Sequence, residues 1–158
     1  MKTQVIIYTD GGCSPNPGLG GWGAVLISPA HKTRKELYGS EADTTNNRME
    51  ILAAIMALRE LKKPCEVELY TDSQYLKKAF TDGWLTKWQR NGWQTSNKKP
   101  VVNQDLWEEI LRLTAQHTVA WKWVKGHAST PENNRCDQLV QRARDEYREA
   151  KLRDRIAE

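Results

Sequence analysis

The spacing of hydrophobic and polar positions predicts five β-strands along the chain. Residues 5–9 are rich in β-branched side chains, residues 66–71 and 119–124 alternate apolar and polar positions, and turn-forming residues bound most of the segments. The predicted strands cover residues 5–9, 21–28, 34–40, 66–71 and 119–124. Short turns separate the first three strands, so we expect these to pair as antiparallel hairpins.

Helical spacing takes over after the third strand. From Asn47 onward, Ile51, Ile55 and Leu58 fall on one broad apolar face, and Pro64 closes the element. Further helices are predicted over residues 73–80 and 103–116 and from residue 131 onward. Hairpins followed by alternating strands and helices predict an α/β fold, with a mixed five-stranded sheet flanked by helices and right-handed crossovers between the later strands.

Length and composition favour a single domain that works in water. The chain has 158 residues, 39% of them hydrophobic, which is enough for one sizeable core, and we expect one domain over residues 1–158 with a charged C-terminal helix from about residue 142. A mean hydropathy of -0.74 and the lack of a long apolar run indicate no membrane role. The N-terminus has no features of a secretory signal, so the expected location is the cytoplasm.

Cysteine content and net charge add little about function. Cys13, Cys65 and Cys136 are odd in number and widely scattered, which fits neither a disulfide framework nor a closed zinc site, and reduced thiols are expected. A net charge of +4 is only a weak bias toward polyanionic partners. Whether the chain binds a polyanion must therefore be judged from where the basic residues lie along the sequence, not from the net charge.

The tripeptide Tyr-Thr-Asp occurs twice, and each copy is predicted to end a strand. Its aspartates are Asp10 and Asp72. If the two strands are parallel neighbours, their carboxyl ends bring the two side chains together at the edge of the sheet where ligands bind. Alternatively, each aspartate could cap the turn or helix that follows it. The repetition favours a shared site.

Two further acids lie near predicted helix starts. Glu50 falls three residues after Asn47, and this spacing also fits a capping box, which requires no chemistry. Asp137 lies early in the last helix, where the helix dipole favours an acidic side chain. Spacing alone leaves both explanations open for each residue.

Five motifs, taken in order, resemble those of the bacterial type 1 ribonucleases H. They are YTDGG at 8–12, TTNNRME at 44–50, TDSQY at 71–75, VKGH at 124–127 and NNRCD at 133–137. The resemblance runs to about Arg144 and implies the ribonuclease H-like fold. It also implies an endonuclease that hydrolyses the RNA strand of RNA/DNA hybrids, leaving 5′-phosphate and 3′-hydroxyl ends. A monomer is the simplest expectation. The chain departs from the common pattern at Asn134, where the family often has an acid.

The resemblance also implies a catalytic site of four carboxylates, from Asp10, Glu50, Asp72 and Asp137, with His127 as the catalytic histidine. Clustered carboxylates repel one another, and a divalent cation relieves that repulsion. Oxygen ligands suit Mg²⁺, with Mn²⁺ as a substitute. Two ions could activate the attacking water and stabilise the leaving oxygen. The family pattern assigns Asp10 to both ions, Glu50 and Asp72 to one, and Asp137 to the other.

The family pattern also assigns substrate contacts. Short polar groups that sense the 2′-hydroxyl of the RNA strand are expected at Cys13, Asn16, Asn46, Asn47 and Gln74. Thr45, Arg48 and Asn103 are expected at a phosphate of the DNA strand. Because Asn16 lies between two prolines, turn formation is an alternative explanation for that residue.

Tryptophans and basic residues alternate between residues 83 and 99. Trp84, Trp88 and Trp93 lie among Lys87, Arg90, Lys98 and Lys99. This segment resembles the family's basic protrusion, which suits backbone attraction and stacking. Alternatively, Trp84 and Trp88 pack on each other at i and i+4 while the basic residues face water. Trp107, Trp121 and Trp123 are expected in or near the core.

Two other functions would fit parts of this sequence. A non-catalytic hybrid-binding module would need none of the four acids. A phosphatase-like carboxylate and metal enzyme would need a compact phosphate pocket and no basic protrusion. The acids and the protrusion together favour the nuclease.

Overall fold

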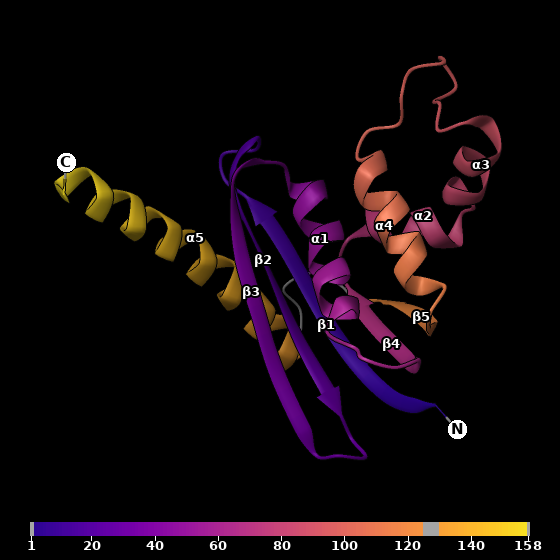
Figure 1. Cartoon of the computed structure of the whole chain (residues 1–158), viewed down its shortest axis with the longest axis horizontal. Helices are drawn as coiled ribbons and strands as arrows, with labels where there is room; N and C mark the ends of the chain where they lie inside the picture. The colour runs from indigo at the N-terminus through magenta and orange to yellow at the C-terminus, as the bar shows by residue number, and fades with distance from the viewer. Residues whose placement is uncertain (1, 125–129, 158) are drawn as a thin grey trace.

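The computed structural model describes residues 2–124 and 130–157, which form one five-stranded sheet with helices on both faces (Figure 1). The strands are β1 (Thr3–Cys13), β2 (Gly18–Ser28), β3 (Thr33–Thr44), β4 (Cys65–Thr71) and β5 (Thr118–Trp123). The helices are α1 (Asn46–Arg59), α2 (Gln74–Thr81), α3 (Trp84–Asn91), α4 (Gln104–Thr114) and α5 (Pro131–Ala157).

The sheet is mixed, as predicted. Its strand order is β3-β2-β1-β4-β5. The short connections from β1 to β2 and from β2 to β3 give antiparallel pairs, whereas β4 lies parallel to β1 and β5 lies parallel to β4. The chain reaches β4 from β3 through α1, and it reaches β5 from β4 through α2, α3 and α4, because the parallel strands cannot be joined by a tight turn. The expected α/β architecture is confirmed.

The helices form two layers. A β-carbon at Gly11 would meet the backbone of α1, whereas one at the next residue, Gly12, would meet Val140 of α5. Since consecutive strand residues point to opposite faces, α1 and α5 cover opposite sides of the sheet. Ile7, Ile51, Ile55, Leu69 and Trp107 are fully buried in the core on the α1 side.

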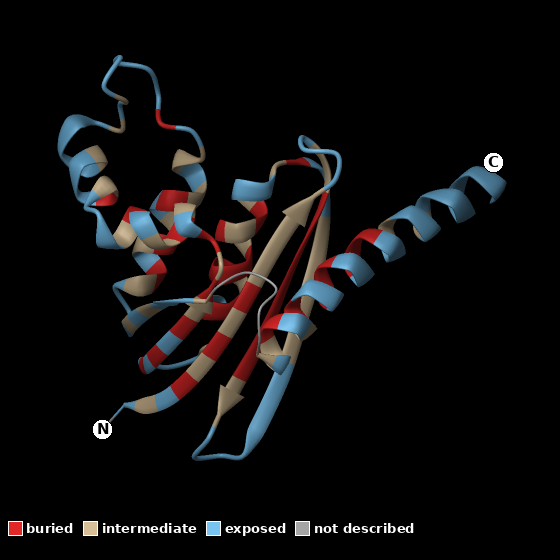
Figure 2. Cartoon of the chain, turned by 180° about the vertical axis from the view of Figure 1, so that it is seen from behind, coloured by how far each residue is buried: buried red, intermediate tan, exposed pale blue. Residues whose placement is uncertain are grey.

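Only the first half of α5 packs on the sheet. Cys136, Leu139 and Ala143 are buried, and burial ends at Arg144 (Figure 2). The later turns project away from the sheet in Figure 1 and are mostly exposed, with the predicted charged composition. No helix in the described part of the chain has the length and apolar content that a membrane span requires.

Two element boundaries differ from the sequence prediction in ways that matter for the site. The strand β1 continues three residues past Asp10 because residues 10–13 pair with β2, although its pairing with β4 stops at Tyr8 and Tyr70. The helix α1 begins at Asn46, and its N-cap is Thr45 rather than the predicted Asn47. Asp10 therefore lies at the end of the parallel pairing, inside a longer strand.

Candidate active site

Three acidic side chains from three elements meet at one edge of the parallel part of the sheet. Asp10 comes from β1, Asp72 directly follows β4, and Glu50 comes from α1. One carboxylate oxygen of each lies within 4.8 Å of the others. The parallel pairing of β1 with β4 brings the two Tyr-Thr-Asp copies side by side, as the repeat suggested.

The carboxylate of Glu50 belongs to this cluster and does not cap α1. The Thr45 hydroxyl oxygen accepts a hydrogen bond from the Arg48 backbone N–H at 3.2 Å, which satisfies the first turn of α1. The capping-box alternative with Asn47 as N-cap was therefore wrong. Among the described residues, the buried Oε2 of Glu50 has no hydrogen-bond partner. A buried carboxylate oxygen without a hydrogen-bond partner is well suited to binding a cation.

Burial and repulsion between neighbouring carboxylates raise the pKa values of Asp10 and Glu50. Burial is the main cause that raises the pKa of Asp10 to about 8, repulsion from Asp72 and Asp137 adds to it, and a backbone hydrogen bond from Gly11 opposes it. Burial, followed by repulsion from Asp10 and Asp72, also raises the pKa of Glu50 well above its ordinary value. These groups would ionise far more readily beside a positive charge.

The cluster opens into a hollow of about 430 Å³. Asp137, in the second turn of α5, lines the same hollow but lies outside the close group of three. The group offers carboxylate oxygens alone, which are the ligands that a hard cation such as Mg²⁺ prefers. The nearby thiol of Cys136 is kept neutral because burial raises its pKa. The donor set therefore fits Mg²⁺ better than a soft metal.

The predicted RNA-strand residues gather at the hollow, and three of them, Cys13, Asn16 and Asn46, are joined by hydrogen bonds. The Cys13 backbone N–H donates to Asn46 Oδ1 at 2.6 Å, and the Asn46 N–H donates to Asn16 Oδ1 at 3.2 Å. Asn46, Asn47 and Gln74 line the hollow itself. Residues from β1, the connection after it, α1 and α2 thus meet on one side of the acidic cluster.

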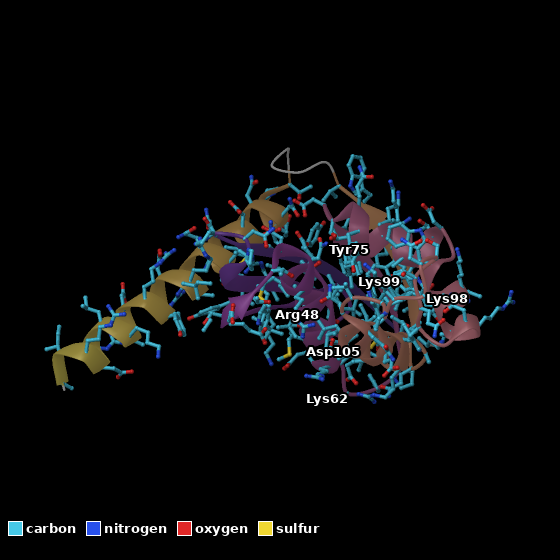
Figure 3. All side chains as sticks on the ribbon, turned by 90° about the horizontal axis from the view of Figure 1, so that it is seen from above. Arg48, Lys62, Tyr75, Lys98, Lys99 and Asp105 are labelled. Atoms are coloured by element: carbon cyan, nitrogen blue, oxygen red, sulfur yellow. The ribbon has the colours of Figure 1, made fainter. Side chains whose placement is uncertain are left out.

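Two of the predicted DNA-phosphate residues, Arg48 and Asn103, are in direct contact. Arg48 Nη1 donates to Asn103 Oδ1 at 3.1 Å, and Asn103 Nδ2 approaches the Tyr75 hydroxyl at 3.4 Å. Figure 3 labels Arg48, Tyr75 and Asp105. Arg48 also forms a bidentate ion pair with Asp105, with N–O distances of 3.0 and 2.8 Å. Sequence reasoning missed Asp105 and Tyr75, although an acid two residues after Asn103 was a possible signal.

The tryptophans of the protrusion pack on one another. The ring centroids of Trp84 and Trp88 lie 6.0 Å apart, and those of Trp88 and Trp93 lie 6.3 Å apart. Trp88 also contacts the fully buried Trp107 at 6.1 Å. Packing therefore accounts for the positions of these rings, whereas the basic residues of the protrusion are exposed: Lys87, Arg90, Lys98 and Lys99.

The other predicted site and core residues have mixed outcomes. His127 lies outside the described residues, and Asn134 is exposed in the first turn of α5. Trp121 stacks on Phe80 with ring centroids 4.3 Å apart. The expectation that Trp123 is near the core was wrong, since 41% of it is exposed at the end of the edge strand β5.

Comparisons with known proteins agree with this arrangement. A family model described as RNase H matches residues 2–145. The chain is 61% identical over 140 residues to a ribonuclease H of Moorella thermoacetica, covering 89% of this chain and 91% of the relative. A ribonuclease H of Symbiobacterium thermophilum is also 61% identical over 140 residues, covering 89% of this chain and 94% of the relative.

Two solved structures are similar in fold. One is LC9-RNase H1, described as a type 1 RNase H with the type 2 active-site motif, with a TM-score of 0.81, 29% identity, and coverage of 92% of this chain and 74% of that one. The other is LC11-RNase H1 in complex with an RNA/DNA hybrid, with a TM-score of 0.68, 25% identity, and coverage of 90% and 98%.

Proposed function

The chain belongs to the ribonuclease H family, and from this premise we propose that it is an endonuclease that cuts the RNA strand of RNA/DNA hybrids with two Mg²⁺ ions, leaving 5′-phosphate and 3′-hydroxyl ends. The ribonuclease H class follows from the family, and the hybrid complex of the LC11 enzyme supports the substrate. The observation that carries the metal-dependent chemistry is the close group of Asp10, Glu50 and Asp72.

The acidic residues divide into two ligand sets in this proposal. Asp10, Glu50 and Asp72 would hold one ion, and Asp10 with Asp137 would hold the second; Mn²⁺ can substitute. When bound, the ions supply Lewis acidity that activates the attacking water and stabilises the leaving oxygen. A cation also offsets the repulsion that raises the pKa values of Asp10 and Glu50, so both would be ionised at neutral pH.

The remaining predicted residues would recognise the two strands. Polar groups at the hollow would contact the RNA minor groove and its 2′-hydroxyls: Cys13, Asn16, Asn46, Asn47 and Gln74. Thr45, Arg48 and Asn103 would bind a phosphate of the DNA strand. The protrusion with Trp84, Trp88 and Trp93 would present its basic residues to the backbone. His127 would move a proton during the reaction.

Product analysis tests the hydrolytic chemistry of this proposal. RNA fragments cut from a hybrid should accept phosphate from a 5′-kinase only after phosphatase treatment, and their 3′ ends should be extended directly by a polymerase. Fragments with 3′-phosphate or cyclic phosphate ends would instead indicate attack by the RNA's own 2′-hydroxyl, which would overturn the proposed mechanism. Titration with Mg²⁺ and with chelator in the same assay tests the cofactor.

A further inference from the structure

Arg144 of α5 is a buried cation that the proposed chemistry does not use. It is only 8% exposed. Its Nε donates to the Leu19 carbonyl oxygen at 3.2 Å, its Nη2 donates to the Ser14 carbonyl oxygen at 2.7 Å, and its Nη1 donates to Gln141 Oε1 at 3.2 Å. Within the described ranges, no carboxylate forms an ion pair with it. The backbone carbonyls therefore compensate much of the cost of burying this charge.

The two carbonyls flank the turn between β1 and β2, since Ser14 directly follows β1 and Leu19 is the second residue of β2; we call residues 13–19 the 13–19 connection. The Ser14 N–H also donates to the Leu19 carbonyl oxygen at 3.1 Å, which closes the connection at its base. From the other side, the Asn46 N–H bonds Asn16 Oδ1 and the Cys13 N–H bonds Asn46 Oδ1. The connection is thus held between α5 and the start of α1.

We infer that Arg144 is a positioning residue for the RNA strand, because it holds both ends of the segment that carries Cys13 and Asn16. The inference rests on the proposed function, in which these residues contact the RNA. Merely fastening α5 to the sheet is a weaker explanation, since the buried residues Leu139 and Ala143 already pack the helix there. The planar guanidinium is suited to bonding two carbonyls at once, which a lysine cannot do with the same geometry.

Steady-state cleavage of an RNA/DNA hybrid tests the inference. Arg144→Met keeps the buried stem and removes the donors, and Arg148→Met is the matched control, one turn further on and 50% exposed beside Asp145. We expect Arg144→Met to raise KM about fivefold with kcat within about twofold, because ground-state positioning is lost. Arg148→Met should behave as wild type. Adding Asn16→Ala should raise KM less in the Arg144→Met background than in wild type.

The outcomes separate this inference from the proposed function. Suppose that wild type cleaves the hybrid. An unchanged KM in Arg144→Met, or an effect on KM that simply adds to that of Asn16→Ala, then overturns the inference and leaves the proposed function standing. If wild type cleaves no hybrid, the proposed function falls and the RNA-strand role falls with it. Should Arg144→Met fold poorly, Arg144→Lys, which keeps the charge but not the fork, should show a smaller rise in KM.

Thiol reactivity provides a measurement that needs no substrate. Cys13 Sγ lies 3.1 Å from the Pro15 carbonyl oxygen and 3.3 Å from the Thr44 carbonyl oxygen, and its one S–H can donate to either, whereas the free thiols of Cys65 and Cys136 are buried. A loosened connection should therefore speed the reaction of Cys13 with an aromatic disulfide reagent several-fold and leave the other two thiols slow. An unchanged Cys13 rate, or equal acceleration of all three thiols through general unfolding, would overturn the inference.

Discussion

Gly11 of β1 lies directly against the backbone of Met49 in α1. A β-carbon added to Gly11 would lie 2.4 Å from the Met49 carbonyl carbon and 2.5 Å from the Glu50 nitrogen. This contact sets how closely α1 approaches β1 and therefore how closely Glu50 approaches Asp10. The absence of a side chain at Gly11 is thus a requirement of the acidic site.

Gly11→Ala should move α1 away from β1. We expect a loss of about 2 kcal/mol or more in the free energy of unfolding, because backbone atoms must shift, together with a large loss of Mg²⁺ affinity. Gly12→Ala is the matched control, since its β-carbon would make an ordinary 3.6 Å contact with Val140. Chemical denaturation and calorimetric Mg²⁺ titration of both variants provide the check. Equal effects of the two substitutions would contradict this role of Gly11.

Asp105→Asn should weaken hybrid binding without much effect on stability. The pair with Arg48 is well aligned but partly exposed, so its loss should change the free energy of unfolding by about 1 kcal/mol or less. Without its partner, Arg48 is free to leave the position that we assign to the DNA phosphate, and KM should rise roughly threefold. Glu108→Gln, on the exposed side of the same helix, should leave KM unchanged. A wild-type KM in Asp105→Asn would remove Asp105 from substrate positioning.

The raised pKa of Asp10 predicts a pH dependence of stability in the metal-free protein. Asp10 has an ordinary pKa of 3.8 and a folded-state pKa of about 8. Between these values the folded state binds more protons than the unfolded state, so the free energy of unfolding contributed by this group falls as pH rises. Asp10→Asn removes the ionisable group and with it this loss of stability at high pH. Its Tm in chelator should exceed that of wild type at pH 8 by several degrees, and the gap should shrink toward pH 4.

Added Mg²⁺ provides the companion test for the same pair of proteins. At pH 8 the ion should raise the Tm of wild type much more than that of Asp10→Asn, since the variant lacks a ligand. A Tm gap in chelator that does not change with pH would show that Asp10 is not destabilised by its surroundings.

Asp10→Asn should also separate cleavage from binding. The variant lacks the carboxylate that the proposal assigns to both ions, so RNA cleavage should fall below about 1% of wild type. Hybrid affinity in fluorescence anisotropy should stay within a few-fold, because binding rests on the polar groups at the hollow and the basic protrusion. Retained cleavage would exclude Asp10 from the mechanism.

Local patterns were sufficient for most of the fold. The alternation in β4 and the apolar face of α1 are properties of short segments, and turn residues marked the hairpins, so the mixed sheet could be predicted. The extension of β1 past Asp10 could not, because Gly11 and Gly12 have no strand preference and are held there by pairing with β2.

Long-range partners account for what the sequence did not reveal about the site. The pairing of Arg48 with Asp105 joins residues 57 positions apart, and that of Arg144 with Ser14 joins residues 130 apart. Nothing in the local sequence of either arginine specifies its partner. The Tyr-Thr-Asp repeat indicated Asp10 and Asp72, whereas Glu50 and Asp137 were recognised through the family motifs. The roles of the site residues, the monomeric state, the single domain and the cytoplasmic location stay predictions.

Strand-specific cleavage tests the central claim most directly. An RNA/DNA hybrid, an RNA duplex, a DNA duplex and single-stranded RNA, each end-labelled, would be incubated with the protein in Mg²⁺ or in EDTA and resolved on one gel. The proposed function predicts cuts only in the RNA strand of the hybrid, and only when Mg²⁺ is present. Binding without cleavage in both Mg²⁺ and Mn²⁺, or cleavage of single-stranded RNA, would contradict it.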